Sequence, residues 1–364
     1  MYKRSVDYVI VLCVAFLIIF GLVMVYSASN VVANYRFQDS WYFFKRQLIF
    51  AVIGLVVMVG IIKLDLHRIK KYTTVIFFVS IALLIIVLIP GVGDVRGGAR
   101  SWIGFGYFSL QPAEFAKLSI VMLIAKYISV YYEDLKKFKV FIAFLALIGV
   151  VFLLIMLQPD FGTGLVLVIS AVLLLFLSGA PLKYFGLCLV VGLVGITGLI
   201  LSAPYRLKRI LAFLDPWQDP LGSGFQGIQS LFAIAPGGLF GLGFNRSMQK
   251  HFFLPEPQND FIFAIVIEEL GLIGGIILIS AYTILFVKTV QNAMRIEDHY
   301  PRFLSLGIAV SLYVQVFINV AVVIGLLPVT GITLPFLSYG GSSLLLSMIS
   351  VGIILNVSRY REYD

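Results

Sequence analysis

The sequence is short of charged residues, cysteine and histidine, and each shortage excludes a class of protein. Charged residues make up 12% of the 364 positions, about half the share of an average soluble domain, so a soluble domain of any size is excluded. The two cysteines, Cys13 and Cys188, lie inside apolar runs, where packing is expected rather than a disulfide or a metal site. The three histidines, His67, His251 and His299, are scattered and lack the spacing of metal ligands.

Long apolar runs dominate instead, since 60% of the residues are hydrophobic. A run of about 20 apolar residues is long enough to cross a membrane as a helix. Ten runs are read at 8–26, 47–62, 72–90, 112–131, 140–157, 163–180, 184–203, 261–287, 303–327 and 340–357. We therefore expect an all-α polytopic membrane protein with about ten transmembrane helices, which forms one domain over residues 1–364. Ser27-Ala28-Ser29 resembles a cleavage site, but the run before it is longer than the apolar core of a signal peptide and predicts an uncleaved anchor.

Basic residues predict the orientation of the chain. The net charge is +9, yet lysine and arginine gather in short connections beside the spans, which is typical of membrane topology rather than of a nucleic-acid partner. This pattern predicts that both termini are cytoplasmic. The connections expected outside are 27–46, 91–111, 204–260 and 328–339. They are long and rich in glycine, proline and aromatic residues, so we expect function on the outer face.

Asp260 stands at the end of the longest outer connection, 204–260 between the seventh and eighth spans, directly before an apolar helix. It has two compatible interpretations. Aspartate is a favoured helix N-cap. A carboxylate at a boundary between water and lipid also has its pKa raised by desolvation, which suits a general base. We therefore expect the active site here.

Further polar residues fall within the expected spans. Glu268 and Glu269 follow Asp260 by about 12 Å along the same helix. Carboxylates inside a span are costly, so this pair either faces a cation or a cavity or serves the structure in a wet or ion-paired position. Gln315 and Asn319 lie one turn apart in a later span and are interpreted as hydrogen-bonding contacts between helices.

Residues 111–117 combine a helix start with a pair of opposite charges. Pro112 suits the first helical turn, Glu114 falls near a capping position, and Lys117 is its neighbour on the same helix face. The segment is either a capped helix with a snorkelling lysine or part of a binding site.

Three further sites carry charge near the outer face. Arg100 follows a glycine-rich stretch and suits a phosphate, a carboxylate or lipid head groups. Asp160 lies at a tight break between two spans and has a turn or cap residue as its default interpretation. Arg206 opens a basic cluster that would hold a pyrophosphate or anchor the chain to lipid. Together these groups suit an anionic lipid-linked substrate, whereas spacing alone does not identify the reaction.

A series of motifs runs in order along nearly the whole chain: Ser101-Trp102-Ile103, Gln111-Pro112-Ala113-Glu114 with Lys117, Gln158-Pro159-Asp160, Gln229-Ser230-Leu231, Pro236-Gly237-Gly238, Leu254-Pro255-Glu256 with Asp260-Phe261-Ile262-Phe263, Glu268-Glu269-Leu270-Gly271, and Leu334-Pro335-Phe336-Leu337-Ser338-Tyr339-Gly340-Gly341-Ser342-Ser343. On these motifs the chain resembles the SEDS (shape, elongation, division and sporulation) family of cell-wall polymerases. Three segments look more like its FtsW and SpoVE branch than its RodA branch: Gln229-Ser230-Leu231, Lys250 ahead of Phe253-Leu254-Pro255-Glu256, and Gly331-Ile332-Thr333-Leu334-Pro335. Family members usually carry threonine where this chain has Asn259.

The resemblance implies a peptidoglycan glycosyltransferase that polymerises lipid II into β-1,4 glycan strands on the outer face of the bacterial cytoplasmic membrane, for division or for the spore cortex. Asp260 matches the family's essential aspartate, and its implied role is to activate the acceptor's 4-hydroxyl. The candidate substrate-binding residues are Glu114, Lys117, Asp160, Arg100, Arg206 and Glu268. A cofactor is left open, with a divalent cation, Mg²⁺ or Mn²⁺, as the candidate that would neutralise the pyrophosphate.

The implied partners are lipid II, the growing glycan, a class B penicillin-binding protein, and divisome or sporulation wall proteins. A lipid II flippase is the alternative function, and a structural scaffold is a third. A flippase needs a polar path through the whole membrane, whereas a polymerase needs its acid on the outer face, where Asp260 is expected. The sequence therefore favours the polymerase.

Overall fold

The computed structural model describes residues 5–96, 98–105, 108–201 and 204–361. The long helices within them are α1 (Tyr8–Phe37), α2 (Tyr42–Lys63), α3 (Leu66–Ile86), α4 (Pro112–Val130), α5 (Phe138–Met156), α6 (Phe161–Leu177), α7 (Leu182–Leu201), α10 (Ile262–Met294), α11 (His299–Val323) and α12 (Gly341–Ser358). The shorter elements are β1 (Gly93–Arg96), β2 (Ala99–Phe105), β3 (Phe108–Leu110), α8 (Pro204–Leu214), α9 (Phe225–Ile234) and the single turns η1 (Glu133–Lys136), η2 (Pro216–Gln218) and η3 (Ala235–Gly237).

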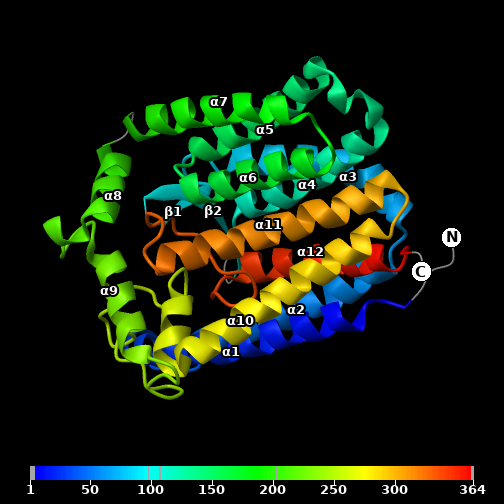
Figure 1. Ribbon diagram of the computed structural model, residues 1–364. Coiled ribbons are helices and arrows are strands. Elements are labelled where there is room, and N and C mark those ends of the chain that lie inside the picture. The colour runs from blue at the N-terminus through cyan, green and yellow to red at the C-terminus, as the bar shows by residue number, and fades with distance from the viewer. Residues whose placement is uncertain (1–4, 97, 106–107, 202–203, 362–364) are drawn as a thin grey trace.

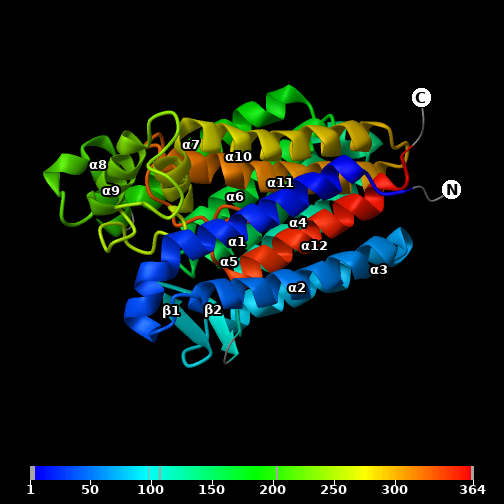
Figure 2. The same cartoon turned by 90° about the horizontal axis from the view of Figure 1, so that it is seen from below.

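Each predicted span coincides with one of the long helices, which confirms the all-α polytopic fold. Seven of them are long and apolar enough to cross a membrane, and α6 and Leu182–Gly195 of α7 are shorter apolar helices. The long helices run side by side, with both chain ends at one end of the bundle and α8 and α9 at the other (Figure 1). From below, the strands lie at this second end, which we call the α8–α9 end (Figure 2).

Helix α11 is the centre of the bundle, because it packs against α4, α6, α10 and α12. Most of its residues are buried, including the polar Gln315 and Asn319. Helix α7 is the opposite case: its residues 189–194 are exposed, and it runs along the edge of the bundle (Figure 1). Polar side chains on α11 therefore have protein rather than lipid around them.

Capping residues begin several of the helices. Oδ1 of Asp7 accepts the N–H of Val9 at 2.9 Å before α1. Asp298 accepts the N–H of Tyr300 at 3.0 Å before α11. Pro112 is the first residue of α4, as the sequence predicted. Its missing N–H costs nothing there, since the first helical N–H groups have no intrahelical partner.

Helix α1 continues about three turns beyond the expected end at residue 26. The apolar run gives way there to serine, asparagine and tyrosine, so composition alone ends the span too early. Ser27-Ala28-Ser29 lies inside this helix and is buried, and the Ser27 hydroxyl donates to Glu269 of α10 at 2.6 Å. Packing against α10 therefore makes the cleavage-like sequence part of a continuous helix.

Two expected outer loops are partly folded. Residues 91–111 contain an antiparallel sheet in the order β1-β2-β3, with Gly93 opposite Ile103 and Gly104 opposite Ser109. Its strands are too short for a clear alternation of apolar and polar residues. The 204–260 connection contains α8 and α9, and α9 packs against α10 and α11. Helix α9 is therefore supported by contacts with the bundle, whereas α8 contacts α7 and η2.

Helix α10 consists of two parts joined at Gly271, whose φ of 68° and ψ of −170° are not helical. The chain changes direction there (Figure 1). Residues 238–243 fill the break: the Gly238 carbonyl accepts the N–H of Leu272 at 2.9 Å, and the Glu268 carbonyl accepts the N–H of Leu242 at 2.9 Å. A Cβ at Gly271 would lie 2.3 Å from the Leu239 carbonyl oxygen, so glycine is required. The residues before it, 262–270, therefore lie outside the straight part of the span.

Candidate active site

Asp260 lies in the turn that leads into α10. The N-cap of α10 is Phe261, and no side-chain hydrogen bond caps this helix. The N-cap interpretation of Asp260 is therefore wrong, because the residue lies one position too early in the chain. The turn is anchored by the burial of Leu254 and Phe261 and by the Gln258 carbonyl, which accepts the N–H of Tyr339 at 2.8 Å.

The Asp260 carboxylate faces Gly331 in the 328–339 connection. Gly331 is exposed, and a Cβ built on it would lie 3.9 Å from Oδ2 of Asp260. Its φ of 73° is in the left-handed region that favours glycine. The 204–260 and 328–339 connections thus meet at the candidate base, and no side chain of residue 331 stands between the carboxylate and solvent.

The environment of Asp260 suits proton transfer near neutral pH. Burial raises the pKa of the Asp260 carboxyl to about 6, the negative charge of Glu256 adds to the rise, and the Arg209 guanidinium opposes it. A base is most effective when its pKa lies near the working pH. Asn259 donates to Oε2 of Glu256 at 2.6 Å, so the residue that departs from the family pattern holds one of the charges acting on Asp260.

Helix α11 holds the backbone of this site. Nδ2 of Asn319 donates to the carbonyl oxygens of Asp260 and Ile332, both at 2.7 Å. One turn earlier, Nε2 of Gln315 donates to the Thr333 carbonyl at 2.9 Å. The sequence interpreted the two amides as contacts between helices; in the structure they bind the irregular backbone around the candidate base.

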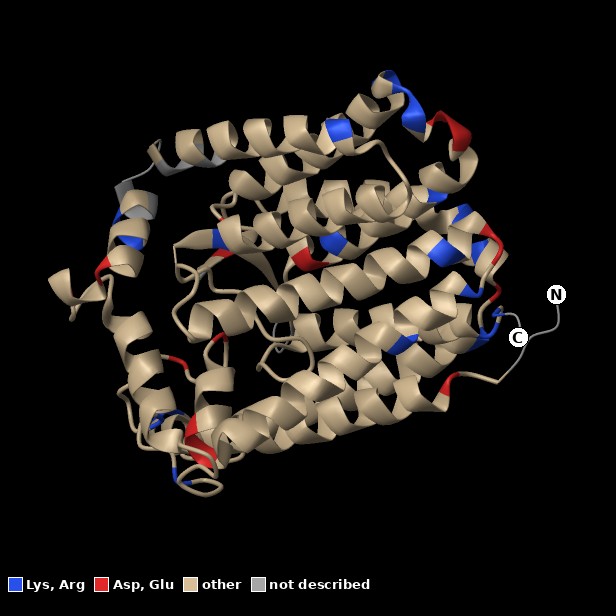
Figure 3. Cartoon of the chain, viewed as in Figure 1, with Lys and Arg blue, Asp and Glu red and all other residues tan. Residues whose placement is uncertain are grey.

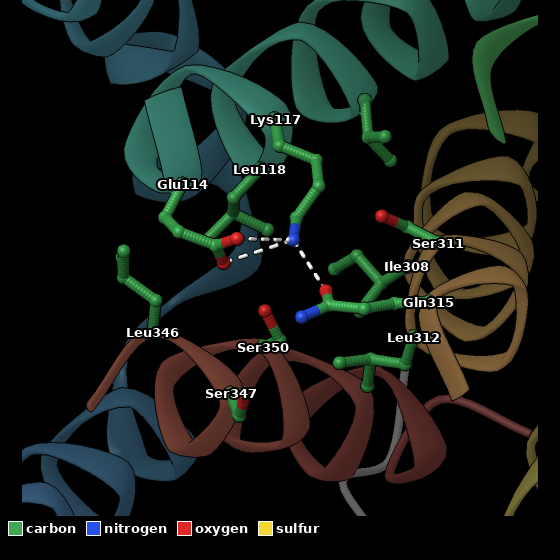
Figure 4. Close-up of a pocket in the computed structure, with 11 residues that line it drawn as sticks. Glu114, Lys117, Leu118, Ile308, Ser311, Leu312, Gln315, Leu346, Ser347 and Ser350 are labelled. Carbon is green, nitrogen blue, oxygen red and sulfur yellow. Dashed lines mark hydrogen bonds and ion pairs between the residues drawn. The ribbon is translucent and has the colours of Figure 1, made fainter. Parts of the chain in front are cut away.

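Glu114 and Lys117 form a buried ion pair on α4 (Figure 4). Nζ of Lys117 lies 2.9 and 3.0 Å from the two carboxylate oxygens of Glu114, and it also donates to Oε1 of Gln315. The two residues are only 7% and 6% exposed. The predicted face-sharing pair is thus observed, and it is joined through Gln315 to the 328–339 connection.

A small cavity lies beside this pair, among α4, α11 and α12 (Figure 4). Ser311, Ser347 and Ser350 supply part of its polar lining. Its accessible volume is about 20 Å³, which is room for about one or two water molecules. A sugar or a pyrophosphate is much larger, so the geometry favours the structural interpretation of the ion pair. A role for Glu114 and Lys117 in substrate binding stays a prediction.

Glu268 and Glu269 are fully buried and hold residues 245–250 against the kink of α10. The Ser247 hydroxyl donates to Glu268 at 2.5 Å, and Nζ of Lys250 lies 3.3 Å from Glu269. Backbone N–H groups of this segment supply further bonds to both carboxylates. These contacts favour the structural alternative that the sequence left open, whereas substrate binding by Glu268 stays a prediction.

The remaining candidates lie on three different elements. Asp160 caps α6, accepting the N–H of Thr163 at 3.1 Å and Nε2 of Gln111 at 2.8 Å, and burial raises the pKa of its carboxyl. The predicted cap is confirmed. Arg100 lies on β2, opposite Val95 of β1. Arg206 is the third residue of α8, and its side chain lies outside the part of the chain that the structure describes.

Metal binding depends on how many ligands the chain offers. Among the residues that the structure describes, no three His, Cys, Asp or Glu side chains lie close enough to hold a metal ion. Mg²⁺ is commonly bound by one or two carboxylates together with substrate phosphates. Asp260 fits a divalent cation only in this shared manner, with the substrate supplying the other oxygens.

Sequence reasoning did not place Asn319 or Gly331 at the site. The available signals were an amide one turn from the end of a span and a glycine in the connection that follows it. Neither signal says which backbone it meets, because Asn319 and Asp260 are 59 residues apart in the chain.

The fold and the site define a polytopic membrane protein with a candidate catalytic carboxylate at one end of a helical bundle. The model of the FtsW, RodA and SpoVE family, described as "Cell cycle protein", matches residues 7–363. Stage V sporulation protein E of Bacillus subtilis is 50% identical over 362 residues, which cover 99% of each chain. The probable peptidoglycan glycosyltransferase FtsW of Geobacter sp. (strain M18) is 42% identical over 353 residues, covering 97% of this chain and 96% of the relative.

Solved structures agree with these relatives. A chain from "Structural coordination of polymerization and crosslinking by a peptidoglycan synthase complex" is 30% identical, with a TM-score of 0.78 and 99% of each chain covered. The rod shape determining protein RodA of Thermus thermophilus is 27% identical, with a TM-score of 0.70 and the same coverage. The chain therefore belongs to the FtsW, RodA and SpoVE family. The expected SEDS membership and the expected peptidoglycan glycosyltransferase class are both confirmed.

Proposed function

We propose that this glycosyltransferase polymerises lipid II into β-1,4 glycan strands with Asp260 as its general base. The observation that carries the assignment is the half-buried Asp260 carboxylate, which faces the exposed Gly331 and has a pKa raised to about 6. The reaction class comes from the family, and the position of this carboxylate at the α8–α9 end supplies the residue that would perform it.

The proposed step is a displacement. The 4-hydroxyl oxygen of the acceptor's N-acetylglucosamine attacks the anomeric carbon of the growing chain's N-acetylmuramic acid. The bond between that carbon and undecaprenyl pyrophosphate breaks, and the leaving group keeps the electron pair. Asp260 accepts the hydroxyl proton. Because an α-linked pyrophosphate becomes a β-1,4 bond, the reaction inverts the configuration.

The leaving pyrophosphate needs positive charge rather than a strong acid. Arg209 supports this role, because its guanidinium is exposed, acts electrostatically on Asp260 and donates to the Val329 carbonyl at 3.3 Å. Arg100, Arg206 and a divalent cation remain candidates. The ammonium of Lys117 is already bound to a carboxylate and an amide inside the protein.

We further propose that the α8–α9 end faces outward and that both termini are cytoplasmic. Lysine and arginine gather at the end that carries the termini (Figure 3), which fits the positive-inside rule. In a variant free of Cys13 and Cys188, Ser223→Cys should react with an impermeant maleimide in intact cells, whereas Glu133→Cys should not. Labelling of Glu133→Cys alone would reverse the orientation and place Asp260 on the wrong side for the reaction.

A class B penicillin-binding protein and division or sporulation wall proteins are the proposed partners. The 30% identical chain comes from a structure described as a complex that coordinates polymerisation with crosslinking. Co-purification of this chain with such a transpeptidase from detergent-solubilised membranes tests the pairing. Recovery of each protein alone, under conditions that preserve both folds, would refute it.

The decisive experiment for the function supplies labelled lipid II in detergent to the purified complex of this chain and its transpeptidase. A polymerase yields a ladder of glycan strands that a muramidase digests. A flippase yields none, because detergent removes the two sides between which it would act. Asp260→Asn should lower synthesis by at least about 100-fold, the low end for loss of a general base. A folded Asp260→Asn complex with wild-type synthesis would overturn the assignment of the base.

A further inference from the structure

Asn319 joins two backbone segments of the candidate site. Its Nδ2 lies 2.7 Å from the carbonyl oxygen of Asp260 and 2.7 Å from that of Ile332, and the residue is only 2% exposed. Carbonyl oxygens only accept, so these two partners fix the amide with its NH₂ group toward them. One side chain therefore ties the backbone of the candidate base to the 328–339 connection.

The position of Asn319 is itself well supported. It lies on α11, the central helix of the bundle. One turn earlier Gln315 holds Thr333, the residue after Ile332, through bonds of 2.9 and 3.3 Å. Two successive residues of the 328–339 connection are thus held by one rigid helix, and Asp260 is tied to the same frame.

Asp260 needs such a tie, because no helix fixes it directly. It lies in a turn before the first residue of α10, and its side chain does not cap that helix. A base must be held within about 0.5 Å of its productive position, and a misplacement of about 1 Å costs about 100-fold in rate. The hydrogen bond from Asn319 reaches the residue whose position matters most.

We propose that Asn319 is the positioning residue of the Asp260 base and that its amide sets where the carboxylate stands relative to Gly331. This inference rests on the proposed function, since it requires Asp260 to accept the proton. Asn319 does not touch the substrate in this scheme. It acts through the backbone of Asp260.

Two consequences separate positioning from a merely structural role. Loss of the amide should lower kcat and leave KM for lipid II unchanged. It should also move the acid limb of the pH profile, because a turn that is no longer tied to α11 admits water, and the pKa of Asp260 falls toward its ordinary 3.8. The charged groups that act on Asp260, Glu256 from its own turn and Arg209 from α8, stay in place in this comparison.

The test uses the complex with its transpeptidase and four variants: Asn319→Leu, Asn319→Ser, Ser305→Ala and Asp260→Asn. Leucine keeps about the volume of the asparagine side chain but has no hydrogen-bond donor. Serine removes the bridging NH₂ group without adding bulk, so at least one of the two variants should fold. Ser305 is a buried polar residue on the same helix, 1% exposed, and Ser305→Ala is the matched control. Each complex is measured for thermal unfolding, for kcat and KM with labelled lipid II, and for kcat/KM from pH 4.5 to 8.

Folded Asn319 variants should lose about 10- to 100-fold in kcat, keep KM within about twofold, and shift the acid limb by about one pH unit downward. Ser305→Ala should match the wild type. The positioning role would be overturned if either folded Asn319 variant had the kcat of the wild type, or if its kcat fell while the acid limb of its pH profile did not move. Activity in Asp260→Asn would instead overturn the base itself, so the two failures are distinguishable.

Discussion

The pH dependence of glycan synthesis tests the environment of Asp260 directly. Burial raises the pKa of this carboxyl from 3.8 to about 6. A base acts in its ionised form, so kcat/KM should fall as the pH drops through about 6, and not near 4 as for an ordinary carboxylate. The ionised fraction is about 0.9 at pH 7 and about 0.1 at pH 5, which predicts a loss of about tenfold between these values.

The two charged neighbours of Asp260 allow the same prediction to be tested from opposite sides. Glu256 raises the pKa of Asp260 and Arg209 lowers it. Glu256→Gln should therefore move the acid limb to lower pH, and Arg209→Gln should move it to higher pH. Both residues are exposed, so each shift should be about 0.2–0.5 pH units and should shrink as salt is added.

The assay measures strand synthesis from labelled lipid II by the purified complex between pH 4.5 and 8, with thermal unfolding at each pH to confirm that the enzyme stays folded. Asp260→Asn provides the background at every pH. An acid limb near pH 4, or one that neither charge substitution moves, would refute the reasoning that places a desolvated Asp260 carboxylate at the chemical step.

Four further predictions concern stability and local structure. Ionised Asp260 is disfavoured in the folded state, so Asp260→Asn should unfold at an equal or higher temperature than the wild type above pH 6. The gain in the free energy of unfolding should reach up to about 3 kcal/mol and disappear below pH 4. A lower unfolding temperature at pH 7 would contradict this. Lys117→Met leaves Glu114 buried without its cation and should lower the free energy of unfolding by about 3–5 kcal/mol. Adding Glu114→Gln to Lys117→Met should recover most of this loss. Equal stability of the single and double variants would show that the pair is not structural. Glu269→Gln should increase amide exchange in residues 245–250 and cost about 1–3 kcal/mol, and unchanged exchange would argue against the anchor at the kink. Gly331→Ala should cost about 1 kcal/mol through its left-handed backbone. It should lower kcat through a shift of this backbone beside Asp260, because the added Cβ itself would reach only ordinary contact distance; an unaltered kcat would exclude such a shift.

The membrane helices could be predicted because their signal is local. A run of apolar residues long enough to cross the bilayer is visible without any knowledge of its neighbours, and each of the ten runs became a helix. Pro112 at the start of α4 and the pairing of Glu114 with Lys117 were equally local, since both depend on positions within one helical turn. Boundaries were harder to place: α1 continues past the apolar run, where Ser27 and Ser29 are buried and Ser27 donates to Glu269 of α10.

The arrangement of the site could not be predicted, because its contacts join distant segments. Asn319 meets the carbonyls of Asp260 and Ile332 from another helix, and nothing in a single span indicates which backbone a buried amide will find. The kink at Gly271 is similar, since it exists only with residues 238–243 inserted into the break. The motif resemblance pointed to Asp260 as a candidate base, whereas its place in a turn rather than at a cap came from the structure.

Four buried polar residues of α10 and α11 share one physical task. Irregular backbone at membrane depth is tolerated only where protein or a cavity supplies its hydrogen bonds. Glu268 and Glu269 supply them to residues 245–250, and Gln315 and Asn319 supply them to the turns around Asp260. Substitutions of these groups should therefore lower stability and kcat together. Loss of Arg209 should raise KM instead, because its guanidinium is exposed and close enough to act on Asp260, where the proposed reaction releases the pyrophosphate. This division separates the residues that build the site from those that bind in it.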